Sequence, residues 1–97
     1  MTELRATLSN AAPAPDLAPP LKALWWAAKG DWSKAHTIVQ DEESGDAAWV
    51  HAYLHRVEGD LGNATYWYRR AGKPAAEDSL EAEWARIVSA LGGDDKA

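Results

Sequence analysis

Apolar side chains recur three and four positions apart along most of the chain between residues 21 and 91. This spacing aligns them on one side of a helix, and no sustained alternation of apolar and polar residues indicates a strand. The pattern is interrupted at Gly30, at 44–46, at Gly59 and at 72–74, where glycine or proline favours the end of a helix. The sequence therefore predicts an all-α protein with helices at 21–29, 32–42, 46–58, 61–71 and 77–91.

The third, fourth and fifth predicted helices have apolar stripes, which mark the expected hydrophobic core. The stripe of the third helix consists of Trp49, Val50, Tyr53, Leu54 and Val57. The stripes of the fourth and fifth helices consist of Leu61, Ala64, Tyr68 and Ala71, and of Leu80, Trp84, Ile87, Val88 and Leu91. His51 and His55 fall nearly opposite the stripe of their helix, so we expect both to be exposed.

Acidic residues stand where helices should begin. Asp31 and Asp60 each follow a glycine, and a carboxylate at this position accepts hydrogen bonds from the free amides of the first turn. Asp78, followed three positions later by Glu81, predicts a cap for the fifth helix.

The first 20 residues differ in composition from the rest of the chain. Residues 11–20 contain four of the five prolines, which predicts an extended linker because proline disfavours helix in the residue before it. Residues 2–9 could form a short helical turn that is either docked or frayed. We therefore divide the chain into a flexible N-terminal segment with a Pro/Ala-rich linker (1–20), a helical-repeat domain (21–91) and an acidic tail (92–97).

The order helix, Gly-Asp, helix occurs twice, at Gly30-Asp31 and at Gly59-Asp60, 29 residues apart. Self-similarity at a period of this size indicates a repeat protein built from helix hairpins. In the second unit, residues 45–74, the positions that carry a family pattern are Ala52, Gly59, Asp60, Leu61, Ala64, Tyr68, Ala71 and Pro74.

This second unit resembles a tetratricopeptide repeat (TPR) and its Sel1-like relatives. The resemblance implies short antiparallel helix hairpins, stacked as a right-handed TPR-like repeat of four or five helices. It also implies a non-catalytic protein–protein interaction module. His51 and His55 depart from the family pattern, because they occupy places where a large apolar residue and an aromatic residue are usual.

Composition excludes several function classes. The formal net charge is −5 and the pI is about 5.0, so the chain lacks the positive field that nucleic acid requires. There is no cysteine, which excludes disulfides and thiolate chemistry. No apolar run has the length of a signal peptide or membrane helix, so we expect a soluble, cytoplasmic protein without membrane contact. No phosphate-binding loop or nucleophile elbow is present, so we expect neither an enzyme nor a cofactor.

Two sets of residues are candidates for binding a protein or peptide partner, including a second copy of the chain as a homodimer. The 29-residue offset brings together Lys22, Trp26, His51 and His55 on one predicted surface. The family register instead places Trp49, Tyr53 and Arg56 on the concave side of the stack. That groove is occupied by the chain itself if the fifth helix enters it through Trp84.

Histidine spacing supports an alternative function, a small metal- or ligand-binding protein. His51, His55 and Glu58 lie on one helical face, and His36 on the neighbouring helix is a possible third imidazole. Imidazoles four positions apart can bind one metal ion, although the short motif is weak by itself. The metal hypothesis therefore uses His36, His51 and His55.

Overall fold

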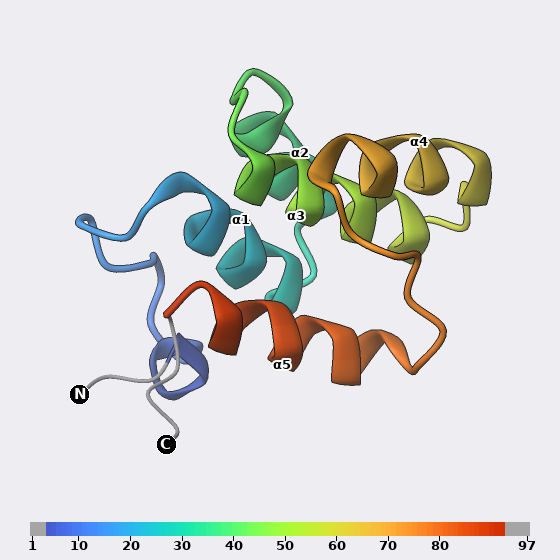
Figure 1. Cartoon of the computed structure of the whole chain (residues 1–97). Coiled ribbons are helices and arrows are strands. Elements are labelled where there is room, and N and C mark those ends of the chain that lie inside the picture. Colours follow the sequence, from blue (N-terminus) through green and yellow to red (C-terminus); the bar gives the residue numbers. More distant parts are fainter. Residues whose placement is uncertain (1–3, 93–97) are drawn as a thin grey trace.

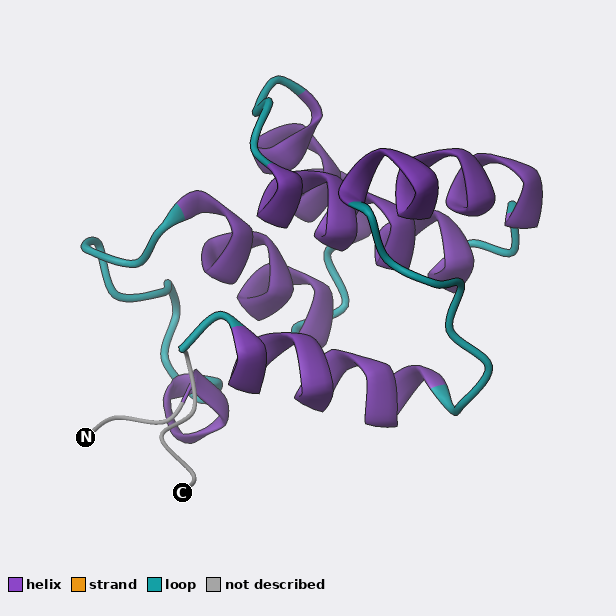
Figure 2. Cartoon of the chain, viewed as in Figure 1, coloured by secondary structure: helices purple, strands orange, loops and turns teal. Residues whose placement is uncertain are grey.

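The computed structural model describes residues 4–92, and all regular structure within them is helical (Figures 1 and 2). The all-α prediction is therefore confirmed for this part of the chain. Only the first residue of the predicted acidic tail is described, because 93–97 lie outside this range. The elements are a 3-10 turn η1 (Leu4–Thr7) and the helices α1 (Pro19–Ala28), α2 (Trp32–Gln40), α3 (Gly45–Val57), α4 (Leu61–Ala71) and α5 (Leu80–Ala90).

Two helix hairpins form through the predicted Gly-Asp corners. α1 packs against α2, and α3 packs against α4. Gly30 and Gly59 have φ values of +89° and +87°, a region that glycine adopts without steric cost. The carboxylate of Asp31 accepts a hydrogen bond from the Lys34 amide, and that of Asp60 accepts one from the Asn63 amide. Both capping predictions are confirmed, and these local signals set where each hairpin reverses.

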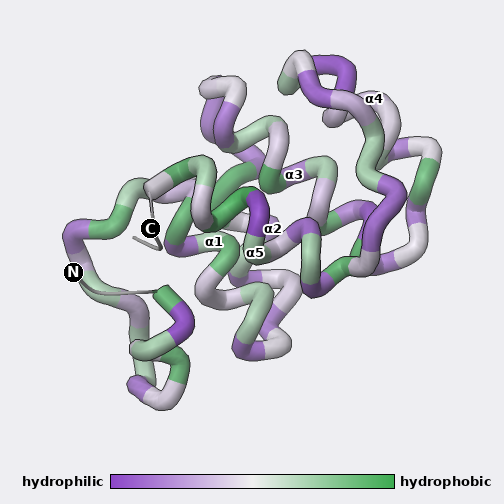
Figure 3. Tube along the Cα trace, turned by 60° about the horizontal axis from the view of Figure 1, so that its bottom comes forward, coloured by the Kyte–Doolittle hydropathy of each residue, from purple (hydrophilic) through white to green (hydrophobic). Residues whose placement is uncertain are grey.

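α3 is the central helix of the fold. It packs against α1, α2, α4 and α5, and every residue from Ala47 to His55 is buried. Figure 3 shows apolar segments gathered where α1, α3 and α5 approach one another. Helix α3 is therefore covered on more than one side, which decides the surroundings of its histidines.

α5 crosses the two hairpins and is joined to them by buried polar contacts. The Trp84 indole Nε1 donates a 2.8 Å hydrogen bond to the carbonyl oxygen of Leu24 in α1. Glu83 is fully buried, where its carboxylate accepts a 2.7 Å bond from Arg56 of α3 and another from the Tyr68 hydroxyl of α4. These contacts connect α5 with α1, α3 and α4.

The N-terminal segment, for which the sequence left docking or fraying open, contains a docked turn. Leu4 is buried in the core, and the Trp25 indole donates a 3.0 Å hydrogen bond to the Thr7 hydroxyl. The ammonium group of Lys29 donates to the carbonyl oxygen of Leu8. The predicted linker ends earlier than expected, because α1 begins at Pro19, and proline suits the first turn of a helix.

Three details of the predicted helices are wrong. α5 begins at Leu80, capped by the Ser79 hydroxyl and not by Asp78, whose carboxylate pairs with Arg86. α2 ends at Gln40, two residues early. Val57, Leu61 and Leu80, all expected in the core, are exposed. Val57 and Leu61 flank the α3–α4 corner, which lies at the edge of the molecule (Figure 1), and Leu80 is the first residue of α5.

Candidate functional site

Three histidines meet between the two hairpins. His36 comes from α2, and His51 and His55 come from successive turns of α3. One ring nitrogen of each lies within 4.8 Å of one from each of the other two. The fold therefore brings together the three imidazoles that the sequence hypothesis named.

The expected exposure of His51 and His55 is wrong. They are only 4% and 8% exposed. The prediction took the apolar stripe of α3, which faces α1 and α5, as the only buried side of this helix. α2 and α4 also pack on α3. The face opposite the apolar stripe is therefore interior as well.

Two tryptophans enclose the histidine cluster. The His36 ring stacks on Trp32, with centroids 4.7 Å apart and planes 10° apart. The His51 ring stacks on Trp67 at 3.9 Å and 13°, and on His55 at 4.8 Å and 25°. This stack fixes the orientations of the rings and limits access of water to them.

Three ring nitrogens of the cluster take part in hydrogen bonds, and one of the others is buried without a partner among residues 4–92. The Nε2 atoms of His36 and His51 lie 3.1 Å apart, and His55 Nδ1 lies 2.8 Å from the Glu58 carboxylate. His51 Nδ1 is buried and makes no hydrogen bond with any described residue. A buried polar atom without a partner is costly, and such atoms are uncommon in folded proteins.

The protonation equilibria of His36 and His51 favour neutral imidazole. Burial, together with the nearby His36 and His55 rings, lowers the pKa of His51 to about 4. Burial also lowers the pKa of His36, with a smaller contribution from His55. Neutral imidazole has the free lone pair that a metal ion requires, so these two rings are ready to coordinate at neutral pH.

The geometry fits the donor set of a transition metal. In a tetrahedral zinc site, Zn–N bonds of about 2.0–2.1 Å place two nitrogen ligands about 3.3 Å apart. The Nε2 atoms of His36 and His51 are close to this separation at 3.1 Å. Glu58 occupies Nδ1 of His55, the position where an outer carboxylate commonly orients a metal-binding histidine through its other nitrogen.

The four residues predicted to form a contact patch do not share an open surface. His51 and His55 are interior, while Lys22 and Trp26 of α1 are half-buried. The Trp26 ring is covered in part by the Lys34 ammonium group, 4.2 Å from its centroid. Burial of the two histidines therefore removes this patch as a docking site.

The second predicted set, which the family register placed on a concave side, is covered by other parts of the chain. Trp49 and Tyr53 are buried, and the Arg56 guanidinium binds the Glu83 carboxylate of α5. The pKa of Arg56 is raised, chiefly by this hydrogen bond. Other parts of the chain therefore cover the residues that were expected to bind a peptide.

Sequence reasoning missed Trp32, Trp67 and Glu83 as parts of these polar and aromatic clusters. A signal existed for Trp32, which lies one helical turn before His36. Glu83 falls four positions before Ile87, on the buried side of α5. The stacking of Trp67 on His51 depends on how α4 packs against α3, and the sequence around Trp67 gives no sign of it.

Among residues 4–92, no helix has the combination of length and apolar character needed to cross a membrane. Comparisons with protein-family models, with curated proteins and with solved structures gave no match for this chain.

Proposed function

We propose that the chain binds a divalent transition-metal ion, with zinc as the first candidate, through His36, His51 and His55. The observation that carries this proposal is the mutual approach of one nitrogen from each ring to within 4.8 Å. Imidazole nitrogen is a preferred ligand of zinc, and binding requires the neutral form that burial favours here.

The environment of His51 supports metal binding over a purely structural role. A ring that served only to fill the core could be a phenylalanine, which buries no polar atom, whereas His51 places its Nε2 atom beside that of His36. Two further imidazoles also gather around the ring, and the Glu58 carboxylate binds one of them, His55. Several imidazole nitrogens this close together can coordinate one metal ion.

The ligand count leaves one tetrahedral position for water or a small external ligand. Asp60 is near His55, but its two carboxylate oxygens accept hydrogen bonds from the backbone and side-chain nitrogens of Asn63. Glu58 binds Nδ1 of His55, on the far side of that ring from Nε2. Three protein nitrogens with one open position are typical of zinc sites that exchange a ligand, whereas structural sites are closed by four protein ligands.

Thermal melting in the presence of zinc tests the proposal. At a free zinc concentration about 100 times Kd, binding to the native state adds about 2.7 kcal/mol, or roughly 10–20 °C in Tm for a chain of this size. His36→Phe keeps a ring to stack on Trp32 but removes both nitrogens, so we expect the zinc shift to disappear. Glu43→Gln is a control for the loss of one charge outside the site. An unchanged Tm of the parent at excess zinc would remove the proposal.

A second candidate function is self-association through α4, as a TPR-like interaction module. The two hairpins agree with the family resemblance, and protein binding is what that resemblance implies. α4 packs mainly against α3, and its outer side carries Leu61, 63% exposed, and the half-exposed Tyr66. A second copy of the chain would give this face a partner.

Charge complementarity favours a second copy as the occupant of this face. Arg69, Arg70 and Lys73 form a basic cluster at the end of α4, and residues 41–43 of the same chain are acidic. Light scattering across a concentration series should detect a dimer that dissociates on Leu61→Asp but not on the exposed-site control Ser89→Asp. A parent chain that is monomeric at every concentration would exclude this candidate.

A further inference from the structure

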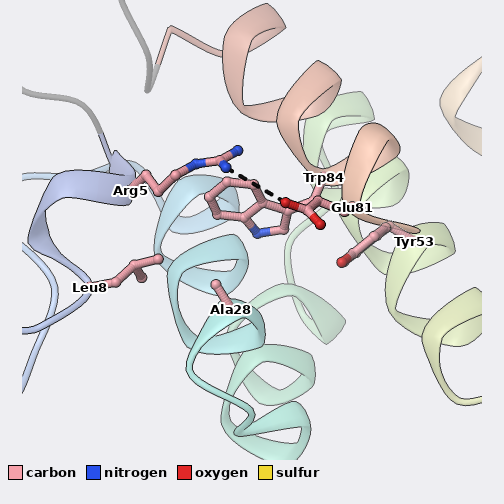
Figure 4. Close-up of a pocket in the computed structure, with 6 residues that line it drawn as sticks. All are labelled: Arg5, Leu8, Ala28, Tyr53, Glu81 and Trp84. Carbon is pink, nitrogen blue, oxygen red and sulfur yellow. Dashed lines mark ion pairs between the residues drawn. The ribbon is translucent and has the colours of Figure 1, made fainter. Parts of the chain in front are cut away.

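A cavity of about 410 Å³ lies away from the histidine cluster, where the N-terminal turn meets α1, α3 and α5 (Figure 4). This volume lies within the usual range for small-molecule sites. Its wall combines aromatic, aliphatic and charged groups. The lining residues are Arg5, Leu8, Ala28, Tyr53, Glu81 and Trp84.

An internal cation already sits at the mouth of this cavity. The guanidinium carbon of Arg5 lies 5.0 Å from the centroid of the Trp84 ring, within the range of a cation–π contact. A guanidinium nitrogen of Arg5 is also 3.8 Å from the Glu81 carboxylate (Figure 4). The Trp84 ring and the Glu81 carboxylate therefore bind a guanidinium group together.

The Arg5 side chain can leave without unfolding the turn that carries it. The Arg5 and Glu81 side chains are 49% and 83% exposed, and ion pairs between exposed groups are weak. The turn itself is held by other residues, namely the buried Leu4 and the hydrogen bond between Thr7 and Trp25. The Arg5 guanidinium can thus leave the cavity while the turn that carries Arg5 stays in place.

The rest of the wall favours a flat or rounded cation with apolar flanks. Tyr53 directs its hydroxyl towards the cavity and supplies a second, buried aromatic side chain to its wall (Figure 4). Leu8 and Ala28 supply aliphatic surface. The formal net charge of −5 attracts cations over longer distances. An anionic ligand would instead meet the Glu81 carboxylate.

We propose that this cavity binds an external guanidinium cation of the size of an arginine side chain, which replaces Arg5 over Trp84 and pairs with Glu81. This site is separate from the proposed metal site and does not depend on it. In the resting state Arg5 competes with the ligand. Removal of the competitor should therefore tighten binding, which is the opposite of what an anion site with Arg5 as its anchor would show.

NMR titration of the whole chain tests the proposal, with the Tyr53 ring and the Trp84 indole as reporters. Ethylguanidinium is the probe for a free small molecule, and N-acetyl-arginine amide is the probe for an arginine residue of a protein. Both should shift the two reporters, and the tighter probe identifies the source of the ligand. In Arg5→Ala, we expect the affinity of either probe to rise by roughly 5- to 10-fold, because the competing internal cation is gone.

Matched variants distinguish a local effect from a change of total charge. Arg86→Ala removes the same charge from the exposed side of α5 and should leave the affinity near that of the parent. Glu81→Gln should weaken binding several-fold, whereas Glu43→Gln should not. Three results would overturn the proposal: no reporter shift even in Arg5→Ala, loss of binding in Arg5→Ala, or an equal gain of affinity in Arg86→Ala.

Discussion

The Nε2 atoms of His36 and His51 lie 3.1 Å apart, although 15 positions separate the two residues in the chain. Two imidazolium ions at this distance would repel each other, and both rings lie among other aromatic groups. The folded protein therefore favours the neutral pair. This preference links the stability of the metal-free protein to pH.

We expect the metal-free protein to lose stability as the pH falls from about 6.5 towards 4. The pKa of His51 is lowered to about 4 in the folded state from 6.5, so the unfolded chain takes up a proton first. The contribution of His51 to the free energy of unfolding is complete above pH 6.5. Its loss at lower pH amounts to roughly 3 kcal/mol, at about 1.4 kcal/mol for each pKa unit. Urea unfolding at pH 7, 6 and 5 measures the first part of this loss, about 2 kcal/mol by pH 5. His51→Phe should be less dependent on pH in this window. Equal dependence in both proteins would contradict the assignment to His51.

Removal of the buried carboxylate of Glu83 should be strongly destabilising. Glu83→Ala leaves the Arg56 guanidinium and the Tyr68 hydroxyl without their shared acceptor. We expect a loss of about 3–5 kcal/mol in the free energy of unfolding, measured by urea denaturation.

Two comparisons test the reason for this loss. Glu81→Ala, on the exposed side of the same helix, should change stability by no more than about 0.5 kcal/mol. The double variant Arg56→Met, Glu83→Leu should recover much of the stability, because the guanidinium that loses its buried partner is removed as well. If the double variant is no more stable than Glu83→Ala, the loss of this partner by Arg56 is not the cause.

Close packing of α3 on α4 depends on the small side chain of Ala64, which is only 2% exposed. Ala64→Leu should overpack this contact and destabilise the protein by roughly 1–3 kcal/mol, seen as a lower Tm. Ala90→Leu adds the same atoms to an exposed position of α5 and should be nearly neutral. Equal Tm values for Ala64→Leu and the parent would mean that the helices pack differently.

The start of α5 depends on Ser79, whose hydroxyl accepts a 3.0 Å hydrogen bond from the Ala82 amide. Ser79→Ala removes this cap and should destabilise the protein by about 1 kcal/mol in thermal or urea unfolding. Ser79→Asp restores an acceptor and should retain most of the stability. Ser89→Ala, at an exposed position near the other end of the helix, is the control. A similar loss in the control would show that the cap has no special role.

The hairpin corners could be predicted from sequence because their causes are local. A glycine with positive φ and an aspartate that caps the next helix act within four residues of each other. The choice between Asp78 and Ser79 as a cap could not be made in this way. Both types of side chain can cap a helix, and Asp78 is drawn to Arg86 and Arg56 by pairings beyond the first turn.

The histidine cluster was only partly predictable. The spacing of His51 and His55 places them on one face of a helix, and this local relationship is correct. Their burial depends on α2 and α4, which pack on α3 through contacts that a single helical wheel cannot represent. The buried Glu83 had the same difficulty, since a carboxylate in the core is tolerable only when Arg56 and Tyr68 arrive from other helices.

The hydrogen bond from Trp84 to the carbonyl oxygen of Leu24 joins residues that are 60 positions apart. Each hairpin forms through contacts between residues that are close in sequence. The contact between α5 and α1 instead closes a much longer loop of the chain, which costs more conformational entropy. During synthesis on the ribosome, both hairpins emerge before α5 does. Until α5 arrives, the carbonyl oxygen of Leu24 and the guanidinium of Arg56 remain accessible to chaperones and to solvent, so α5 completes the interior formed by residues 4–92.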